Sequence, residues 1–332
     1  MSNMRISVLA FVIALAATSP ADYRIRELGR AGVILDHFRI NARGETVGST
    51  YNHRTFPQAS VQLNGEERLL YDSGRPSRAN DINDLGIAVG GWDGPNDELP
   101  AGYWTGTVFT QIAEGLALRV NDLNQITGFG FDNPIFFWSD GELINVPMLQ
   151  NSETLQWTNY DQVALSNSGM LLGNATSFNY THRTGWYWTE ATGTVRLPNL
   201  WPSDLLDNGR ILNEDGRWFE GTQVVEVTPL TYATAATENG KVLGRDANHV
   251  WSIYENGIVT NISDLLAPEF SDWRVDWGID INERGQILGQ AISPDGRDVR
   301  VLMEPVPEPG TVFAVGFGLV ALMNRRRVRL DG

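Results

Sequence analysis

The sequence predicts an all-β fold, a β-propeller of about seven four-stranded blades, with six blades as the alternative. Two observations predict it: a hairpin motif that returns about every 40 residues, and an aromatic strand that follows most copies of the motif. Repeats of about 40 residues with four strands each have the period of propeller blades. The 34 glycines and 11 tryptophans agree with this prediction, because many short strands and tight turns need such residues.

The hairpin motif is clearest at Ile40–Gly48, Ile82–Gly90 and Ile281–Gly289. In each copy an Asn stands three residues before a Gly, as Asn41 does before Gly44. Asn favours the first position of a type I turn, and Gly supplies the positive φ that closes the hairpin. Weaker copies place the turn residue at Asn124, Gly169, Gly209 and Gly240. A nucleotide-binding glycine loop is the alternative, but no helix follows and no lysine is in place.

Strand order predicts how the ring closes. Most hairpins are followed by an aromatic strand, a polar turn and another strand, as Trp186–Trp188 is followed by Thr194–Leu197. After the last hairpin the sequence offers one more strand, Asp298–Met303, so one blade lacks a strand. The segment Tyr23–Leu28 has strand character, and we expect it to complete the last blade.

The C-terminus has the features of a processing address. A Pro-Glu-Pro motif precedes an apolar run, Gly310–Met323, and a basic cluster follows it. At ~1.5 Å per residue this run gives about 21 Å of helix, short of the ~30 Å hydrocarbon core, so snorkelling arginines and a thinner bilayer would be needed. A buried helix of a soluble domain is one alternative, and a permanent anchor is another. The predicted sorting residues are Val306, Pro307, Glu308, Pro309, Gly310, Arg325, Arg326 and Arg327.

This tail resembles the C-terminal sorting tail of PEP-CTERM proteins. The resemblance implies an exosortase-like processing enzyme as a partner, and attachment to the inner membrane through the C-terminal helix before processing. At the N-terminus, Arg5 precedes the apolar stretch Ile6–Ala17, which is typical of a signal peptide cleaved before Asp22. We therefore expect a signal peptide at 1–21, a propeller at 22–305 and a sorting tail at 306–329. The protein would be exported by the Sec route and reach the cell surface or the medium.

The repeats resemble those of the extracellular HAF-repeat family from Tyr23 to Met303. That family has a hydrophobic-Asn-Asp-x-Gly-x-Val-Val-Gly hairpin followed by an aromatic strand, and the hairpin recurs here. The His-Ala-Phe tripeptide that names the family is absent from this sequence. The resemblance implies a fold and an exported setting, without a known chemistry.

No catalytic residue, metal site or cofactor is predicted. The four histidines are not spaced as metal ligands, and cysteine is absent. The segment Asp81–Gly86 departs from a calcium loop at Leu85 and has no distal bidentate Glu. The formal net charge of −15 disfavours nucleic acid as a partner. The many carboxylates leave a glycosidase-type pair open.

Aromatic residues outside the repeated aromatic strand are the candidate ligand-binding residues, because such rings can stack on the apolar face of a pyranose. They are Trp92, Trp157, Tyr160, Trp273 and Trp277. The alternative is that they fill the core between blades. The sequence thus favours a non-enzymatic binding or structural module of the cell surface or extracellular matrix, with exopolysaccharide as the candidate ligand. An exported carbohydrate-active propeller, a lyase or a glycoside hydrolase, is the alternative.

Overall fold

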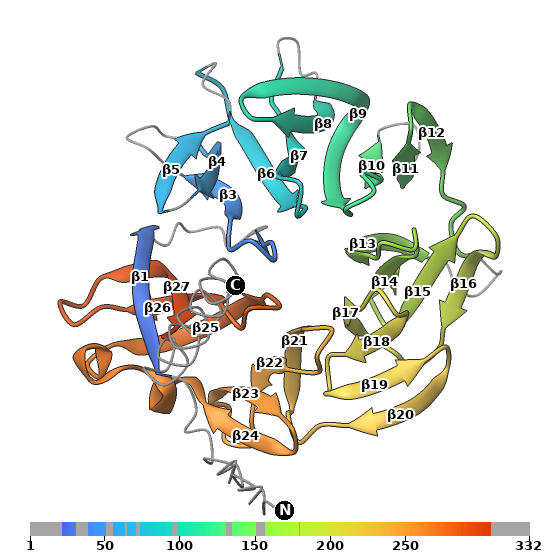
Figure 1. Cartoon of the computed structure of the whole chain (residues 1–332). Coiled ribbons are helices and arrows are strands. Elements are labelled where there is room, and N and C mark those ends of the chain that lie inside the picture. Colours follow the sequence, from blue (N-terminus) through green and yellow to red (C-terminus); the bar gives the residue numbers. More distant parts are fainter. Residues whose placement is uncertain are drawn as a thin grey trace, which may run out of the picture. The chain divides into compact units, whose positions relative to one another are not determined.

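The computed structural model describes residues 22–30, 39–50, 56–63, 65–70, 74–94, 99–130, 135–150, 157–178 and 180–306. The chain divides into two units. One unit, Tyr23–Pro305, is a ring of β-sheets (Figure 1). Of the other unit, which holds both ends of the chain, Asp22 and Val306 are described. The predicted signal peptide and the tail beyond Val306 lie outside the described residues.

Five sheets have four strands each, and all five are antiparallel. The first contains β2 (Arg39–Ile40), β3 (Thr46–Thr50), β4 (Gln58–Leu63) and β5 (Glu66–Leu69). The second contains β13 (Trp157–Leu165), β14 (Leu171–Ser177), β15 (Arg183–Thr189) and β16 (Gly193–Leu197). The third contains β17 (Pro202–Leu205), β18 (Arg210–Asn213), β19 (Arg217–Glu220) and β20 (Gln223–Val227). The fourth contains β21 (Tyr232–Ala236), β22 (Val242–Arg245), β23 (Trp251–Glu255) and β24 (Ile258–Asn261). The fifth contains β25 (Arg274–Ile281), β26 (Ile287–Ile292), β27 (Asp298–Pro305) and β1 (Tyr23–Arg30).

The remaining sheet has seven strands and corrects the predicted blade count. It contains β6 (Ser77–Ile82), β7 (Ile87–Trp92), β8 (Pro100–Thr105), β9 (Val108–Val120), β10 (Ile126–Gly130), β11 (Phe136–Ser139) and β12 (Glu142–Asn145). The long strand β9 pairs with β8 as far as Glu114 and with β10 from Gly115 onward. Five blades are therefore separate four-stranded sheets, and two predicted blades are merged through β9. The prediction of about seven separate blades is wrong here because β9 contains one Gly and no Pro or Asn that could form a turn.

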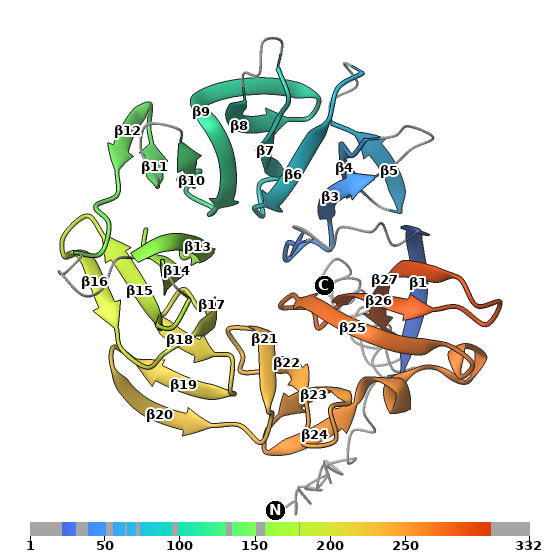
Figure 2. The ribbon, with the colours of Figure 1, turned by 180° about the vertical axis from the view of Figure 1, so that it is seen from behind.

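The expected closure of the ring is confirmed. Strand β1 pairs antiparallel with β27, and Tyr23 lies opposite Pro305. The Tyr23 hydroxyl also donates a hydrogen bond to the Gly285 carbonyl at 2.9 Å. The first and last strands of the ring thus share one sheet, as Figure 2 shows from behind.

The core lies between neighbouring sheets. Val47 and Ala59 of one sheet pack with Ala79, Ile82 and Trp104 of the next. The largest fully buried side chains include Trp104, Trp186 and Trp218, which come from β8, β15 and β19. The repeated aromatic strand therefore packs between blades, where its large rings exclude water.

Helical structure is limited to two short 3-10 segments, Ile262–Leu265 and Pro268–Phe270, in the part of the chain that the structure describes. Over the same residues, no helix has the length and apolar character needed to cross a membrane. The predicted membrane helix, 310–323, lies outside them.

Candidate functional site

Seven inner hairpin turns have the predicted geometry within the described ranges. In the first, Gly44 N donates to Asn41 O at 3.0 Å and Gly44 has a φ of +81°. The other six turns have the same hydrogen bond, donated by Gly86, Asn124, Gly169, Gly209, Gly240 and Gly285. Asn124, which replaces Gly, has a φ of +60°. We call the end of the channel where these turns lie the turn end, and the opposite end the groove end.

The channel contains two cavities, of about 270 Å³ at the turn end and about 530 Å³ toward the groove end. Both cavities are lined by Arg39, Arg119, Val163, Ser203, Thr234 and Ile279, so they are two halves of one channel. The half of the channel at the turn end is lined by seven equivalent residues, one from each repeat. Each stands two residues before the first residue of its turn. They are Arg39, Asp81, Arg119, Ala164, Asp204, Ala235 and Asp280.

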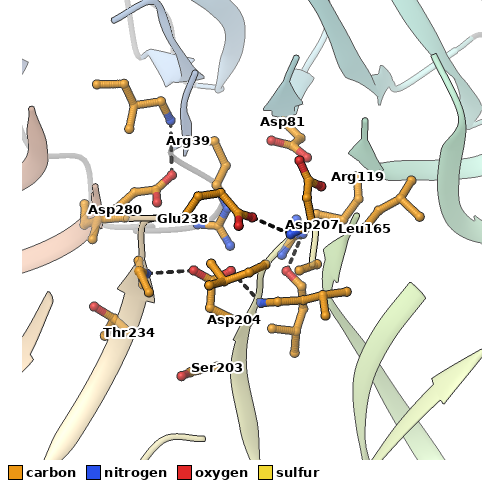
Figure 3. A pocket seen from close by; sticks show the side chains of 18 of the residues that line it. Arg39, Asp81, Arg119, Leu165, Ser203, Asp204, Asp207, Thr234, Glu238 and Asp280 are labelled. Carbon is orange, nitrogen blue, oxygen red and sulfur yellow. Dashed lines mark hydrogen bonds between the residues drawn. The ribbon is translucent and has the colours of Figure 1, made fainter. Parts of the chain in front are cut away.

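The three aspartates among these positions link neighbouring repeats. Each carboxylate accepts a hydrogen bond from the next backbone N–H of its own chain segment and another from the adjacent inner strand. Figure 3 shows both bonds of Asp204 and the bond of Asp280 to the adjacent strand. The links to the adjacent strand join Asp81 to Val120 N at 3.1 Å, Asp204 to Ala236 N at 2.8 Å, and Asp280 to Ile40 N at 3.2 Å. These carboxylates therefore fasten one repeat to the next.

Burial controls the ionisation of the channel. Burial first, and then the nearby charge of Asp280, raise the pKa of Asp204 to about 7. Burial also raises the pKa of Asp81 and of Asp280. Arg119 has its pKa lowered to about 10, first by burial and then by Arg39. Arg119 is 7% exposed and donates to Val163 O at 2.7 Å, which links two further repeats.

A second set of links lies at the turn end. These links involve the second residue of each turn. Its side-chain oxygen accepts a hydrogen bond from the backbone N–H of the equivalent residue in the preceding repeat. Ala42 N donates to Asp84 at 2.7 Å, and Asp84 N donates to Asp122 at 2.8 Å. The series continues from Asp122 through Asn167, Asp207 and Glu238 to Glu283. Position 42 is Ala, so the side-chain acceptor is missing where the last repeat meets the first.

The groove end carries a different set of residues. Phe129, Trp201 and Tyr232 line the larger cavity together with Asp161 and Glu214. Trp201 and Glu214 also line a third cavity, of about 350 Å³, outside the channel. The remaining residues of this third cavity are mainly polar, and they are Arg183, Asn199, Leu200, Asn213, Asp215, Arg217 and Thr231. The two cavities together form a groove with Trp201 at its middle.

Backbone hydrogen bonds position Trp201. Its N–H donates to Asn213 Oδ1 at 2.6 Å, and its carbonyl accepts from Glu214 N at 3.0 Å. The Arg183 guanidinium carbon lies 5.0 Å from the centre of the Trp201 ring, which is a cation–π distance. Trp201 is half-buried, so part of its ring remains open to the groove.

Two carboxylates of the groove have raised pKa values. Burial raises the pKa of Glu214, Arg183 opposes this change, and Asp215 adds to it. Burial also raises the pKa of Asp161. Among the described residues, no group of three or more His, Asp or Glu side chains is arranged to hold a metal ion. The groove can therefore offer aromatic surface, hydrogen-bonding groups and carboxylates to a ligand.

Four of the five aromatic residues proposed from the sequence have described side chains, and none of these four, Trp92, Tyr160, Trp273 and Trp277, is among the lining residues of these three cavities. Tyr160 is 6% exposed and packs against Trp186, with ring centres 6.1 Å apart. Trp273 and Trp277 pack against the core of the last sheets. Trp92 ends β7, and Trp157 begins β13, but the side chain of Trp157 lies outside the described part.

Sequence reasoning missed Trp201, Tyr232 and the channel aspartates. Trp201 had a usable signal, because it stands directly before an inner strand and outside the repeated aromatic strand. The aspartates share a position two residues before the turn, which an alignment of the seven repeats would have shown. Of the predicted sorting residues, Val306 is described, and its N–H donates to Asp22 O at 2.6 Å. The other seven lie outside the described residues.

Two solved structures were compared with the ring. A dipeptidyl peptidase 4 from Porphyromonas gingivalis has 10% identity and a TM-score of 0.43, over 83% of this chain and 53% of that one. This chain thus spans about half the length of that protein. A mutant of AofleA from Arthrobotrys oligospora has 11% identity and a TM-score of 0.31, over 84% of this chain and 86% of that one. No curated protein matches the sequence.

The C-terminal tail does match a family model. Residues 305–327 match the PEP-CTERM protein-sorting motif, and this range contains all eight predicted sorting residues. The motif implies an exported protein that is anchored in the membrane before processing by exosortase, a membrane enzyme. The chain therefore combines a β-propeller with the sorting signal of an exosortase-processed protein.

Proposed function

We propose that this protein is exported by the Sec route, held in the inner membrane by a C-terminal helix, and released by an exosortase-like enzyme to the cell surface or the medium. There the propeller acts as a non-enzymatic binding module for saccharide, and exopolysaccharide is the ligand that this location favours. The sorting motif at 305–327 supports the route. The resemblance of the repeats to HAF repeats supports the extracellular setting.

The observation that carries the binding function is the groove around Trp201. A partly buried tryptophan that lines both cavities can give a pyranose an apolar surface on which to stack. Amide, hydroxyl, carboxylate and guanidinium groups surround this ring, and they suit the hydroxyl groups of a sugar. The five aromatic residues named from the sequence stay as secondary candidates.

A carbohydrate-active enzyme is the second candidate. Asp204 favours it, because a carboxyl group with a pKa of about 7 inside a channel suits a general acid. Against it, the two oxygens of Asp204 accept backbone hydrogen bonds from Leu205 and Ala236. The same holds for Asp280 with Ile281 and Ile40. We therefore place the binding function first.

Incubating the purified mature protein with polysaccharide from the host's own coat separates the two functions. We expect the protein to retain the polysaccharide without shortening it. Size-exclusion chromatography measures the length of the polysaccharide chains. Shortening of the chains would favour the enzyme instead. If the polysaccharide is neither retained nor shortened, both functions are contradicted. For the route, intact mass of the surface form should give a chain that begins near Asp22 and ends near the Pro-Glu-Pro motif.

A further inference from the structure

We propose that the bound saccharide carries free amino groups, and that it lies across Trp201 with one sugar in the channel mouth and the next in the neighbouring cavity. This inference rests on the proposed saccharide-binding function and specifies the class of sugar. Three observations support it: the shape of the groove, the charge of the channel, and two carboxylates that have no ion-pair partner among the described residues.

The shape indicates at least two sugar positions. The cavity of about 530 Å³ and the cavity of about 350 Å³ are each as large as a small-ligand site, ~300–1,000 Å³. The two cavities share Trp201 and Glu214. A saccharide that extends from the first cavity into the second therefore passes the indole ring. Arg183 holds this ring from the side of the second cavity. A ligand that fills both cavities is therefore an oligosaccharide rather than a single sugar.

The charge of the channel favours a cation. Among the described lining residues of its two halves, eight carboxyl groups face two guanidinium groups, and they still outnumber them at a mildly acidic pH, where Asp204 with its pKa of about 7 is largely protonated. The carboxyl groups are Asp81, Asp161, Asp204, Asp207, Glu214, Glu238, Asp280 and Glu283, and the guanidinium groups are Arg39 and Arg119. A narrow channel with walls of low dielectric constant focuses such a field toward its mouth. A uronate or sulfate polymer would be repelled there, and a protonated amine would be attracted.

Glu214 and Asp161 are the residues that we assign to the amines. Neither forms an ion pair with another described residue. In contrast, Asp215 in the same groove is paired with Arg217 at 2.6 Å. The backbone of Glu214 is fixed, because its N–H bonds to Trp201 and its carbonyl accepts from Ala233 N at 2.7 Å. Burial disfavours the charged carboxylate, as the raised pKa of Glu214 indicates, and an amine at hydrogen-bonding distance would restore it.

Calorimetric titration of the mature protein with three oligosaccharides of equal length tests the sugar class. The probes are a glucosamine oligomer, its N-acetylated counterpart and a galacturonate oligomer, at a mildly acidic pH that keeps the amines protonated. We expect the glucosamine oligomer to bind about tenfold more tightly than the acetylated one, which corresponds to one charge-assisted hydrogen bond of ~1.4 kcal/mol. The galacturonate oligomer should give no heat of binding.

The outcomes separate this inference from the proposed function. Equal or tighter binding of the acetylated or galacturonate oligomer contradicts the amine preference and leaves saccharide binding in place. If none of the three probes and no host polysaccharide binds, the proposed function itself is contradicted. The affinity should also rise from the monosaccharide to the disaccharide, because the second sugar reaches the cavity beyond Trp201. An affinity that is the same for both would contradict the placement across Trp201.

Two variants locate the site. Glu214→Gln keeps the shape and removes the charge, so it should lower the affinity for the glucosamine oligomer about tenfold and leave the acetylated oligomer unaffected. Trp201→Ala should weaken both about tenfold through lost stacking. Glu220→Gln, an exposed acid outside the groove, and Phe178→Ala, an aromatic ring that is 73% exposed, are the matched controls. Thermal melting checks that each variant is folded. If folded Glu214→Gln and Asp161→Asn both keep the wild-type preference, the assignment is wrong.

Discussion

The two ends of the channel are built from the same strands but differ in how they use the repeat. At the turn end, equivalent positions carry similar residues, and their side chains link several neighbouring repeats in the same way, as the amides of Asn282, Asn41, Asn83 and Asn121 do. At the groove end, Trp201 and Tyr232 share one repeat position, five residues before the first turn residue, and the same position carries unlike residues in other repeats, such as Leu116 and Asp161. The comparison teaches that repetition here marks the part that holds the ring together. The residues that vary are the ones to examine for binding.

The largest effect should come from removing a turn asparagine. Asn83 is 4% exposed and makes four side-chain hydrogen bonds, one of which reaches Asn121 O in the next repeat at 2.9 Å. Asn83→Ala should reduce the free energy of unfolding by about 3 kcal/mol, because it leaves several buried polar groups unpaired. Urea unfolding measures this change. The same variant should bind saccharide normally below its melting temperature. Asn208→Ala, in an exposed turn with one such bond, is the control.

The second effect concerns pH and the channel aspartates. The pKa of Asp204 is raised to about 7 in the folded protein from an ordinary value of 3.8. The folded state therefore binds the proton more tightly than the unfolded state does. The folded protein should therefore lose stability progressively as the pH rises from about 4 to about 7 and this carboxyl group ionises. Asp204→Asn should flatten this part of the stability profile, which melting temperatures across the range would measure. An unchanged slope would contradict the assignment.

A third and smaller effect sharpens the comparison at the turn end. Ala42 interrupts the series of side-chain acceptors at the junction of the last and first repeats. Asn167 shows that an amide oxygen accepts the bond as well as a carboxylate does, because it accepts from Asp122 N at 2.8 Å. Ala42→Asn should therefore stabilise the ring by about 1 kcal/mol. Ala42→Leu provides no acceptor and should not stabilise it. Equal melting temperatures for the two variants would mean that the missing acceptor has no effect.

The smallest effect should be at Asn124. This residue adopts a left-handed conformation with a φ of +60°, which Gly adopts without strain. Its side chain accepts one hydrogen bond from Asn83 at 3.0 Å. Relief of strain and loss of this bond oppose each other, so Asn124→Gly should change the free energy of unfolding by less than about 0.5 kcal/mol. Asn124→Val cannot relieve the strain, and we expect it to destabilise by more than 1 kcal/mol. Chemical unfolding of the pair tests both values.

The turns and the closure of the ring could be predicted because their causes are local. Backbone geometry requires Asn or its substitute at the first turn position and Gly at the fourth. The last blade lacks one strand in the C-terminal part of the ring, so the N-terminal strand has to supply it. The merging of two blades was missed because extended backbone on both sides of Gly115 is compatible with one strand or two. A Cβ at Gly115 would lie 1.8 Å from Phe129 O, so this glycine allows a close approach that only the folded chain reveals.

The groove could not be predicted because it depends on which side chains from distant segments meet. Trp201 and Tyr232 are 31 positions apart in sequence but line one cavity. Tyr160 and Trp201 are both aromatic residues next to or within an inner strand, yet the first is buried in the core and the second faces the groove. Only an alignment of the repeats separates them, because Tyr160 stands six residues before its first turn residue and Trp201 stands five before its own.

The pairing of β1 with β27 has a consequence for the timing of folding. Strand β1 begins at Tyr23 and needs a partner that ends at Pro305, so the final sheet forms only when nearly the whole ring has been synthesised. The earlier sheets are built from neighbouring strands and can form one after another as the chain emerges. Until β27 arrives, one edge of the growing arc stays open. The ring can therefore be completed only after the chain has been synthesised as far as the start of its sorting motif.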